Sequence, residues 1–187
     1  PEDPDPGVVM NDPEESSAAG TRRVQAMIDF FSLIPNIEEL NLHWYGSRPS
    51  TPTLTPADTA EKHCFDKLFL AISFPKLKNL TLRGLHITQS SLQKVLLAPS
   101  LQQFHLEYIR LAGSLRPIID ILTSPNREFT QFYLDDIYEQ RLVHFAIEGK
   151  PKFPHQGRVV GPSTVFRKGK EVTLPLEYGF LHGRSLG

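Results

Sequence analysis

The stretches LKNLTLRGLHI (residues 77–87) and LQQFHLEYIRL (residues 101–111) carry apolar residues at the same five offsets and start 24 residues apart. A further copy, FTQFYLDDI (residues 129–137), starts 28 residues after the second, and IEELNL (residues 37–42) is an earlier, shorter copy. Self-similarity of this kind predicts a repeat architecture, in which each copy forms one unit and neighbouring units share a core.

Each copy reads as a strand and is followed by a segment with helical spacing. After residues 101–111, for example, Ile118, Ile119 and Leu122 recur at helical spacing before Pro125, which ends the run. Residues 46–57 have the composition of a loop and lengthen the first interval. The predicted helices span residues 21–34, 58–72, 90–98, 114–124 and 142–148, with Thr21, Asp58, Ser90 and Ser114 as N-caps.

The apolar pattern resembles the leucine-rich repeat, Leu-x-x-Leu-x-Leu-x-x-(Asn/Cys)-x-Leu. The Asn/Cys position holds Leu85, Ile109 and Ile137, so a regular asparagine ladder is not expected. The resemblance implies an α/β fold, an irregular leucine-rich-repeat solenoid of about four strand-helix units with a curved parallel sheet on its concave face.

The sequences of two segments resemble a more specific family. IPNIEELNL (residues 34–42) and FPKLKNLTL (residues 74–82) resemble the repeat regions of filamentous-fungal F-box/leucine-rich-repeat proteins. In that family the F-box docks on a ubiquitin-ligase adaptor and the repeats hold the substrate. No F-box-like segment is visible in this sequence, so the resemblance implies an adaptor contact only through a missing upstream F-box.

Alternation along the strands predicts which side chains lie on the concave face, because every second residue points away from the core. We therefore expect a partner-binding patch whose side chains stack in rows across neighbouring strands. One alternative is that an exposed strand face must simply be polar, with Arg83 and Glu107 pairing. The predicted partner-binding residues are Glu39, Asn41, His43, Asn79, Thr81, Arg83, Gln103, His105, Glu107, Gln131, Tyr133 and Asp135.

Charge divides the chain into three parts. Residues 1–20 hold six acids, no base and four prolines, and we predict a disordered acidic tail. Residues 21–150 form the predicted repeat domain. Residues 151–187 hold six bases against two acids and lack the repeat; a C-terminal cap, a hairpin or a loose tail remain open, with short strands predicted at 159–160 and 172–174.

The composition bears on the cellular compartment and on the kinds of partner that the chain can bind. Cys64 is the single cysteine, which rules out an internal disulfide and favours an intracellular compartment, cytoplasmic or nuclear. No apolar run approaches the roughly 20 residues of a membrane span, and the basic residues are too sparse to predict nucleic-acid binding. The sequence starts at Pro1 without a methionine, so we expect a processed chain or a fragment.

Enzyme motifs are weak. No phosphate-binding loop, dinucleotide fingerprint, nucleophile elbow or zinc-protease motif occurs. Cys64 falls on an apolar helix face, which favours a core thiol over a nucleophile, and His105 with Glu107 lack the further ligands that a zinc site needs. We therefore predict no enzyme activity, cofactor or metal, and non-catalytic recognition of a protein partner or substrate. The alternatives are an unrelated scaffold or effector-type interaction protein, or an enzyme fragment.

Overall fold

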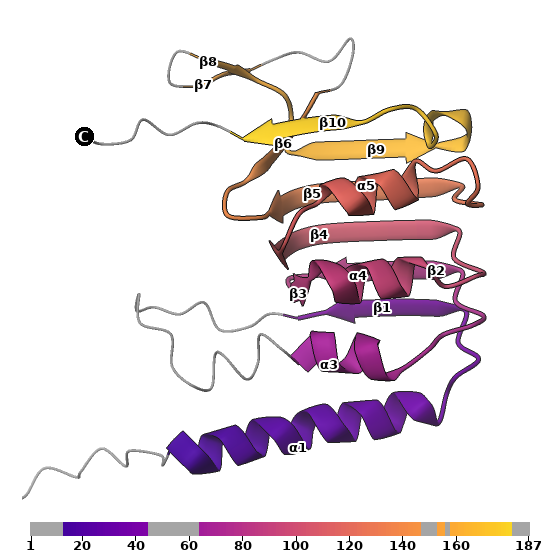
Figure 1. Ribbon diagram of the computed structural model, residues 1–187, viewed down its shortest axis with the longest axis vertical. Helices are drawn as coiled ribbons and strands as arrows, with labels where there is room; N and C mark the ends of the chain where they lie inside the picture. The colour runs from indigo at the N-terminus through magenta and orange to yellow at the C-terminus, as the bar shows by residue number, and fades with distance from the viewer. Residues whose placement is uncertain (1–12, 45–63, 147–152, 156–157, 181–187) are drawn as a thin grey trace, which may run out of the picture.

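The computed structural model describes residues 13–44, 64–146, 153–155 and 158–180, which form a mixed α/β structure around one mostly parallel sheet (Figure 1). Five of its six strands follow the order β1-β2-β4-β5-β9, and the short β3 pairs with β4. All pairs are parallel except β5 with β9. The strands are β1 (Glu39–His43), β2 (Asn79–Arg83), β3 (His86–Thr88), β4 (Gln103–Ala112), β5 (Gln131–Tyr138) and β9 (Thr164–Lys168).

Three helices lie along one face of this sheet (Figure 1). α3 (Cys64–Ala71) connects β1 to β2, α4 (Gln89–Leu96) connects β3 to β4, and α5 (Arg116–Leu122) connects β4 to β5. Parallel neighbours need such crossovers because the chain must return to the starting edge before the next strand begins. The opposite face carries no helix in the described part of the chain, and we call it the open face.

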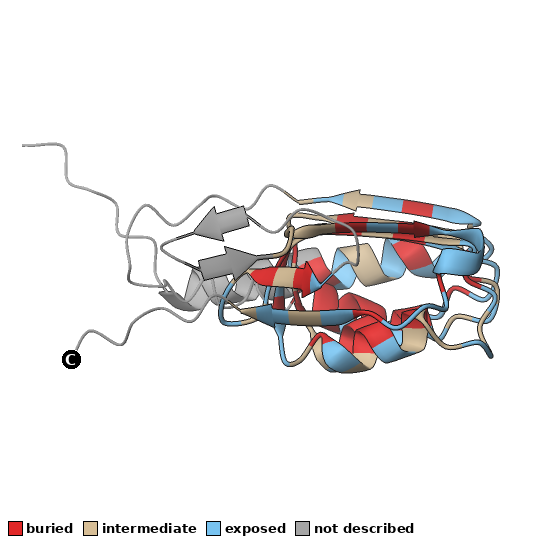
Figure 2. Cartoon of the chain, turned by 90° about the horizontal axis from the view of Figure 1, so that it is seen from above, coloured by how far each residue is buried: buried red, intermediate tan, exposed pale blue. Residues whose placement is uncertain are grey.

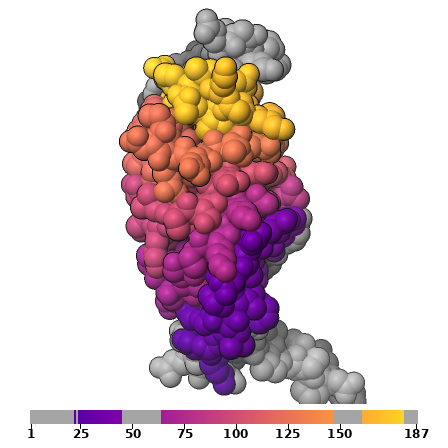
Figure 3. All heavy atoms as spheres, turned by 90° about the vertical axis from the view of Figure 1, so that its right-hand side faces the viewer, coloured from indigo at the N-terminus to yellow at the C-terminus, as the bar shows by residue number. Residues whose placement is uncertain are grey.

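Residues at equal offsets of the repeat are register partners in the sheet. Asn79 lies opposite Gln103, and Gln103 lies opposite Gln131. The 24- and 28-residue intervals in the sequence are therefore the register of the sheet. β1 joins in the same way, with Glu39 opposite Asn79. In Figure 3 the segments follow one another as bands in chain order, from α1 at one end to the C-terminal strands at the other.

The strands change phase at one repeated position. Leu82 and Leu85 are three residues apart, so regular alternation would expose one of them, yet both are fully buried. Gly84 between them has φ 74°, and the matching residues of the next copies, Tyr108 and Asp136, have φ 53° and 47°. A residue in the left-handed region turns the strand, so that the apolar residues on both sides of it face the core.

The described residues share one hydrophobic core between the sheet and the helices (Figure 2). Leu106 and Leu134 from the strands, with Leu92 and Leu122 from the helices, have no exposed surface. Burying one such side chain contributes roughly 1.5–3 kcal/mol. The core therefore fixes which face of each strand remains available to a partner.

The N-terminus of α4 is capped from two repeats. Thr88 Oγ1 accepts a hydrogen bond from the backbone N–H of Ser91 at 3.3 Å. Buried Asp66 on α3 accepts bonds from the backbone N–H and the hydroxyl of Thr88, at 2.7 and 2.8 Å. Ser90 was the predicted N-cap, and this prediction was wrong because the helix already includes Ser90, while Thr88 still has an extended backbone.

Helix C-termini are bonded by cations from the following repeat. Lys94 donates to the carbonyl oxygen of Leu70, at the end of α3. Arg127 donates to the carbonyl oxygens of Leu96 and Ala98 beyond α4, at 2.6 and 2.8 Å. Cations favour this position because the last carbonyls of a helix lack partners and carry partial negative charge. These bonds tie neighbouring repeats together outside the apolar core.

The start of α5 differs from its prediction. Leu115, not Ser114, is the N-cap residue, and its backbone N–H donates to Glu139 Oε1 at 2.7 Å. The hydroxyl of Ser114 still accepts a bond from the backbone N–H of Arg116 at 3.2 Å. Pro117 lies in the first turn, where a missing N–H costs nothing.

The helix predicted over residues 142–148 is wrong. Val143–Ala146 form strand β6, which pairs antiparallel with β10 (Glu177–Phe180). Val143 and Phe145 are both fully buried, which is the two-residue period of a strand. Pairing with a segment far along the chain outweighed the local helical spacing.

Residues beyond 150 complete the sheet at one end. β9 pairs antiparallel with β5 at the end of the strand order, so residues 164–168 are ordered as part of the sheet. β8 (Arg158–Val160) includes the predicted strand at 159–160 and pairs with β7 (Phe153–His155). The strand predicted at 172–174 is wrong; a 3-10 helix, Gly169–Glu171, precedes a turn there, and Val172 is buried.

The first helix, α1 (Pro13–Ser32), begins eight residues before the predicted Thr21, so part of the predicted disordered tail is helical. Proline suits the first turn of a helix. Val24 and Phe31 are buried on its inner face. Residues 1–12, the predicted loop at 46–57 and the predicted Asp58 cap lie outside the described residues.

A candidate binding surface on the open face

The twelve residues predicted from the repeat lie in three rows across β1, β2, β4 and β5, as the register requires. None of them is buried. The first row is Glu39, Asn79, Gln103 and Gln131; the second is Asn41, Thr81, His105 and Tyr133; the third is His43, Arg83, Glu107 and Asp135.

Strand β9 extends each row by one residue that the repeat did not predict. Lys168 lies opposite Gln131, Phe166 opposite Tyr133, and Thr164 opposite Asp135. Repeat matching missed them because β9 runs antiparallel and belongs to no repeat. The sequence of β9 gave no signal of its alternating burial either, because the apolar Phe166 is 53% exposed while the charged Arg167 is buried.

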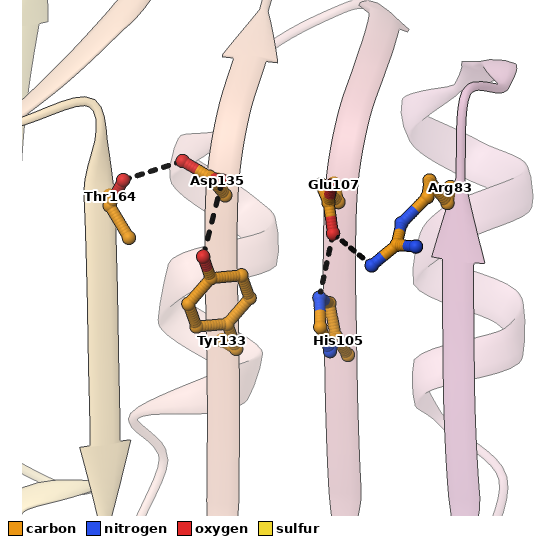
Figure 4. A network of polar contacts seen from close by, with 6 residues as sticks. All are labelled: Arg83, His105, Glu107, Tyr133, Asp135 and Thr164. Carbon is orange, nitrogen blue, oxygen red and sulfur yellow. Dashed lines mark hydrogen bonds and ion pairs between the residues drawn. The ribbon is translucent and has the colours of Figure 1, made fainter.

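The third row contains an ion-paired cluster (Figure 4). Arg83 Nη2 donates to Glu107 Oε2 in a contact between β2 and β4. The Nε2 atom of His105, two residues before Glu107 on the same strand, lies 3.4 Å from the same carboxylate oxygen. All three side chains are partly buried, so water weakens this charge pairing less than at a fully exposed site. The predicted pairing of Arg83 with Glu107 is confirmed.

Asp135 lies in the same row but accepts only hydroxyl hydrogen bonds among the described residues. The hydroxyl of Tyr133 donates to its Oδ2 at 3.1 Å, and the hydroxyl of Thr164 donates to its Oδ1 at 2.5 Å. These bonds join β5 to β9 and hold the carboxylate between them (Figure 4). The carboxylate is thus oriented by hydroxyls, and no salt bridge to it occurs within the described residues.

Aromatic rings occupy the middle row. The rings of His105 and Tyr133 lie 4.4 Å apart between centroids, at an interplanar angle of 61°. Phe166 is the register partner of Tyr133 on the next strand. Three rings therefore follow one another across β4, β5 and β9. A half-exposed phenylalanine on an otherwise polar sheet face is the kind of side chain that binding surfaces use as an anchor.

Burial and charge shift two ionisable groups of the middle row. The pKa of His105 is lowered mainly because the ring is partly buried, although the nearby Glu107 acts in the opposite direction. The pKa of the Tyr133 hydroxyl is raised, first by burial and then by the carboxylates of Asp135, Glu107 and Asp136. His105 is therefore mainly neutral near pH 7, and the hydroxyl of Tyr133 keeps its proton to donate.

The structure does not draw every predicted residue into this network. Glu39, Asn41 and His43 on β1 are exposed, and no hydrogen bond or ion pair joins them to the cluster within the described chain. The same holds for the side chains of Asn79, Thr81, Gln103 and Gln131. The interacting residues are concentrated on β2, β4, β5 and β9.

Chemistry elsewhere in the described residues is limited. No group of three or more His, Cys, Asp or Glu side chains there is placed to hold a metal ion. Cys64 is buried, and its sulfur contacts the sulfur of Met27 at 3.7 Å. This packing agrees with the expected core thiol. The prediction that the chain is not an enzyme stays a prediction.

Comparison with known proteins adds no family. No family model matches the chain, and no curated protein or solved structure matches it either. None of the described helices is long and apolar enough to cross a membrane. The function must therefore be argued from the open face itself.

Proposed function

We propose that this chain is a non-catalytic protein-recognition module that binds a protein partner on the open face of its sheet. The observation that carries the proposal is the row of rings from His105 through Tyr133 to Phe166, flanked by the ion pair of Arg83 and Glu107. Tyrosine and arginine are enriched among the residues that dominate binding energy. Phe166 lies on the edge strand β9 and adds an exposed aromatic ring to this otherwise polar face.

The ordered hydrogen bonds also favour recognition over simple solvation. Tyr133, Asp135 and Thr164 hold one another in place, as do Arg83 and Glu107. Side chains that are already fixed lose less conformational entropy when a partner binds, so more of the contact energy appears as affinity. The three rows extend across neighbouring strands, and an extended surface of this kind suits a macromolecular partner.

We further propose that the architecture is an irregular leucine-rich-repeat solenoid. The repeated register, one strand and one helix per copy, and the repeated left-handed residue at Gly84, Tyr108 and Asp136 support it. Three copies are followed by a helix, whereas the fourth, at β5, is followed by strand β6. The resemblance of residues 34–42 and 74–82 to fungal F-box/leucine-rich-repeat proteins makes substrate recognition for ubiquitin ligation the proposed setting, with an adaptor contact only through a missing upstream F-box.

The experiment is affinity capture from a cell extract with the double variant Tyr133→Ala/Phe166→Ala. Its matched control is Leu70→Ala/Leu97→Ala, because those leucines are 52% and 55% exposed, close to the 53% of Phe166, but belong to the helix side. We expect a partner that the wild type and the control retain and the open-face variant loses. Equal capture by all three proteins, with unchanged thermal melts, would place the binding site elsewhere.

A further inference from the structure

We propose that the part of the open face between β4, β5 and β9 binds an arginine or lysine side chain of the partner protein. The rings of Tyr133 and Phe166 would contact its aliphatic stem, and the carboxylates of Asp135 and Asp136 would receive its charge. This inference rests on the proposed function and names the chemistry of the partner.

The charges on this corner do not balance. Glu107 is neutralised by Arg83, with His105 close to the same oxygen. Asp135 receives only the hydroxyls of Tyr133 and Thr164, and no salt bridge reaches Asp135 or Asp136 within the described residues. The corner therefore carries net negative charge, and a cationic side chain is its electrostatic complement.

Lys168 on the neighbouring strand is too far along that strand to supply the missing charge. Lys168 is the basic residue of β9 on this face. It lies opposite Gln131 and is four residues from Thr164, the register partner of Asp135. At about 3.3 Å per residue this is a separation of roughly 13 Å along the strand. That distance exceeds a Debye length at physiological salt, so Lys168 does little for Asp135.

Asp136 follows Asp135 at the phase change in β5 and lies between the buried residues Leu134 and Ile137. Its φ of 47° removes it from regular alternation, and its side chain is only partly buried. Its charge reaches the hydroxyl of Tyr133, since Asp136 together with Asp135 and Glu107 raises the pKa of that hydroxyl. The charges of two carboxylates, neither in a salt bridge with a described residue, therefore act on the hydroxyl of Tyr133.

Aromatic rings next to these carboxylates select a long cationic side chain over a bare cation. Phe166 is 53% exposed and is the register partner of Tyr133, so two aromatic residues lie opposite each other on neighbouring strands beside Asp135. Arginine and lysine carry an aliphatic stem that packs on apolar surface, and their charged ends are attracted to ring faces. The same site discriminates against an acidic side chain by charge repulsion.

The experiment uses three bead-bound peptide libraries of identical random flanks, with arginine, glutamate or leucine fixed at the centre, and the fluorescently labelled chain as the probe. The test variant is Asp135→Asn/Asp136→Asn. Asparagine preserves the shape and tolerates the left-handed backbone at 136. At 135 its amide oxygen still accepts from one of the two hydroxyls of Tyr133 and Thr164, and its amide N–H can donate to the other. Its matched control is Asp29→Asn/Asp120→Asn, at two exposed helical positions.

We expect the wild type and the control to retain the arginine library about tenfold more than the glutamate library, because a charge-assisted pair contributes at least the ~1.4 kcal/mol that corresponds to a factor of ten. The Asp135→Asn/Asp136→Asn variant should lose that preference, and Phe166→Ala should lower retention of the arginine and leucine libraries together.

A preference for arginine that survives in the asparagine variant, a preference for glutamate, or binding of no library would each overturn this inference. The proposed function is judged separately, by whether Tyr133→Ala/Phe166→Ala loses its captured partner. A partner lost in that variant, combined with no charge preference, would retain the recognition module and reject the basic side chain.

Discussion

The two ends of the sheet are closed by different means. At the β9 end, residues far apart in the sequence are tied together: Tyr178 on β10 donates to Glu139 Oε1 at 2.7 Å, and Arg116 donates to the carbonyl oxygen of Leu176 at 3.1 Å. At the β1 end, α1 packs on α3 and on Phe74, whose ring lies 6.0 Å from that of Phe31.

The buried polar groups differ in the same way. Arg167 on β9 is buried, and its guanidinium donates to the carbonyl oxygens of Glu171, Leu174 and Pro175. Burial lowers the pKa of this guanidinium, so its hydrogen bonds must offset a desolvation cost. Near β1, the corresponding charge contact is the ion pair of Glu38 with Lys78, which is exposed. The non-repeating C-terminal residues therefore close the sheet through specific hydrogen bonds, whereas the N-terminal end is closed by apolar helix packing.

The largest effect should come from breaking the core that both ends share. Leu106→Asp places a charge at a fully buried position in the central strand β4. An unpaired buried charge costs several kcal/mol, and we expect a loss of about 4 kcal/mol or more. The measurement is thermal melting by circular dichroism, with His105→Gln on the same strand as control. A cooperative melt at the wild-type temperature would show that the strand register is wrong.

The next prediction compares the loss of stability when a glycine with positive φ is substituted near each end of the sheet. In Gly84→Ala, next to β1, the new Cβ would lie 2.1 Å from the carbonyl oxygen of Trp44, so the backbone must shift. In Gly169→Ala, after β9, no atom lies within 4 Å, and only the positive φ opposes the substitution. We expect losses of about 3 and about 1 kcal/mol in chemical denaturation. Equal losses of stability would mean that the carbonyl group of Trp44 can move away from the new Cβ without a free-energy cost.

A smaller effect on stability distinguishes the hydrogen bonds at the β9 end from the exposed ion pair near β1. Tyr178→Phe removes the hydroxyl that bonds Glu139, and we expect a loss of about 1–2 kcal/mol because the acceptor is charged and partly buried. Lys78→Gln removes an exposed ion pair that solvent screens, and it should leave stability nearly unchanged. Urea denaturation of both variants measures the difference. The reverse ranking would contradict the comparison of the two ends.

The smallest effect is a pH dependence on the open face, which belongs to neither end. The pKa of His105 is lowered in the folded protein, so the unfolded chain binds its proton more readily. Stability from this residue is complete above the unfolded value of about 6.5 and declines as pH falls from there towards the folded pKa. Melting temperatures of the wild type and His105→Gln, measured from pH 7.5 to pH 5, should converge as pH falls. A constant difference would exclude this linkage.

Much of the candidate site followed from the sequence because it depends on local alternation. Once Leu80, Leu82 and Leu106 were assigned to the core, the outward positions between them were fixed, and the register placed Arg83 beside Glu107 as predicted. Phe166 and Thr164 escaped prediction because their positions depend on pairing with a strand about 30 residues earlier, and such pairing leaves no periodic signal.

Local spacing determined the strands, the helices between them and the twelve outward positions, since apolar residues must recur on one face of each element to be buried together. Tertiary structure decided what spacing left ambiguous. Val143–Ala146 became a strand because β10 was available to pair with it. Tyr108 and Asp136 took a left-handed backbone because the nearest apolar residues before and after each of them had to reach the same core. Long-range pairing and packing set these features, because their free energy exceeds the small differences in local propensity.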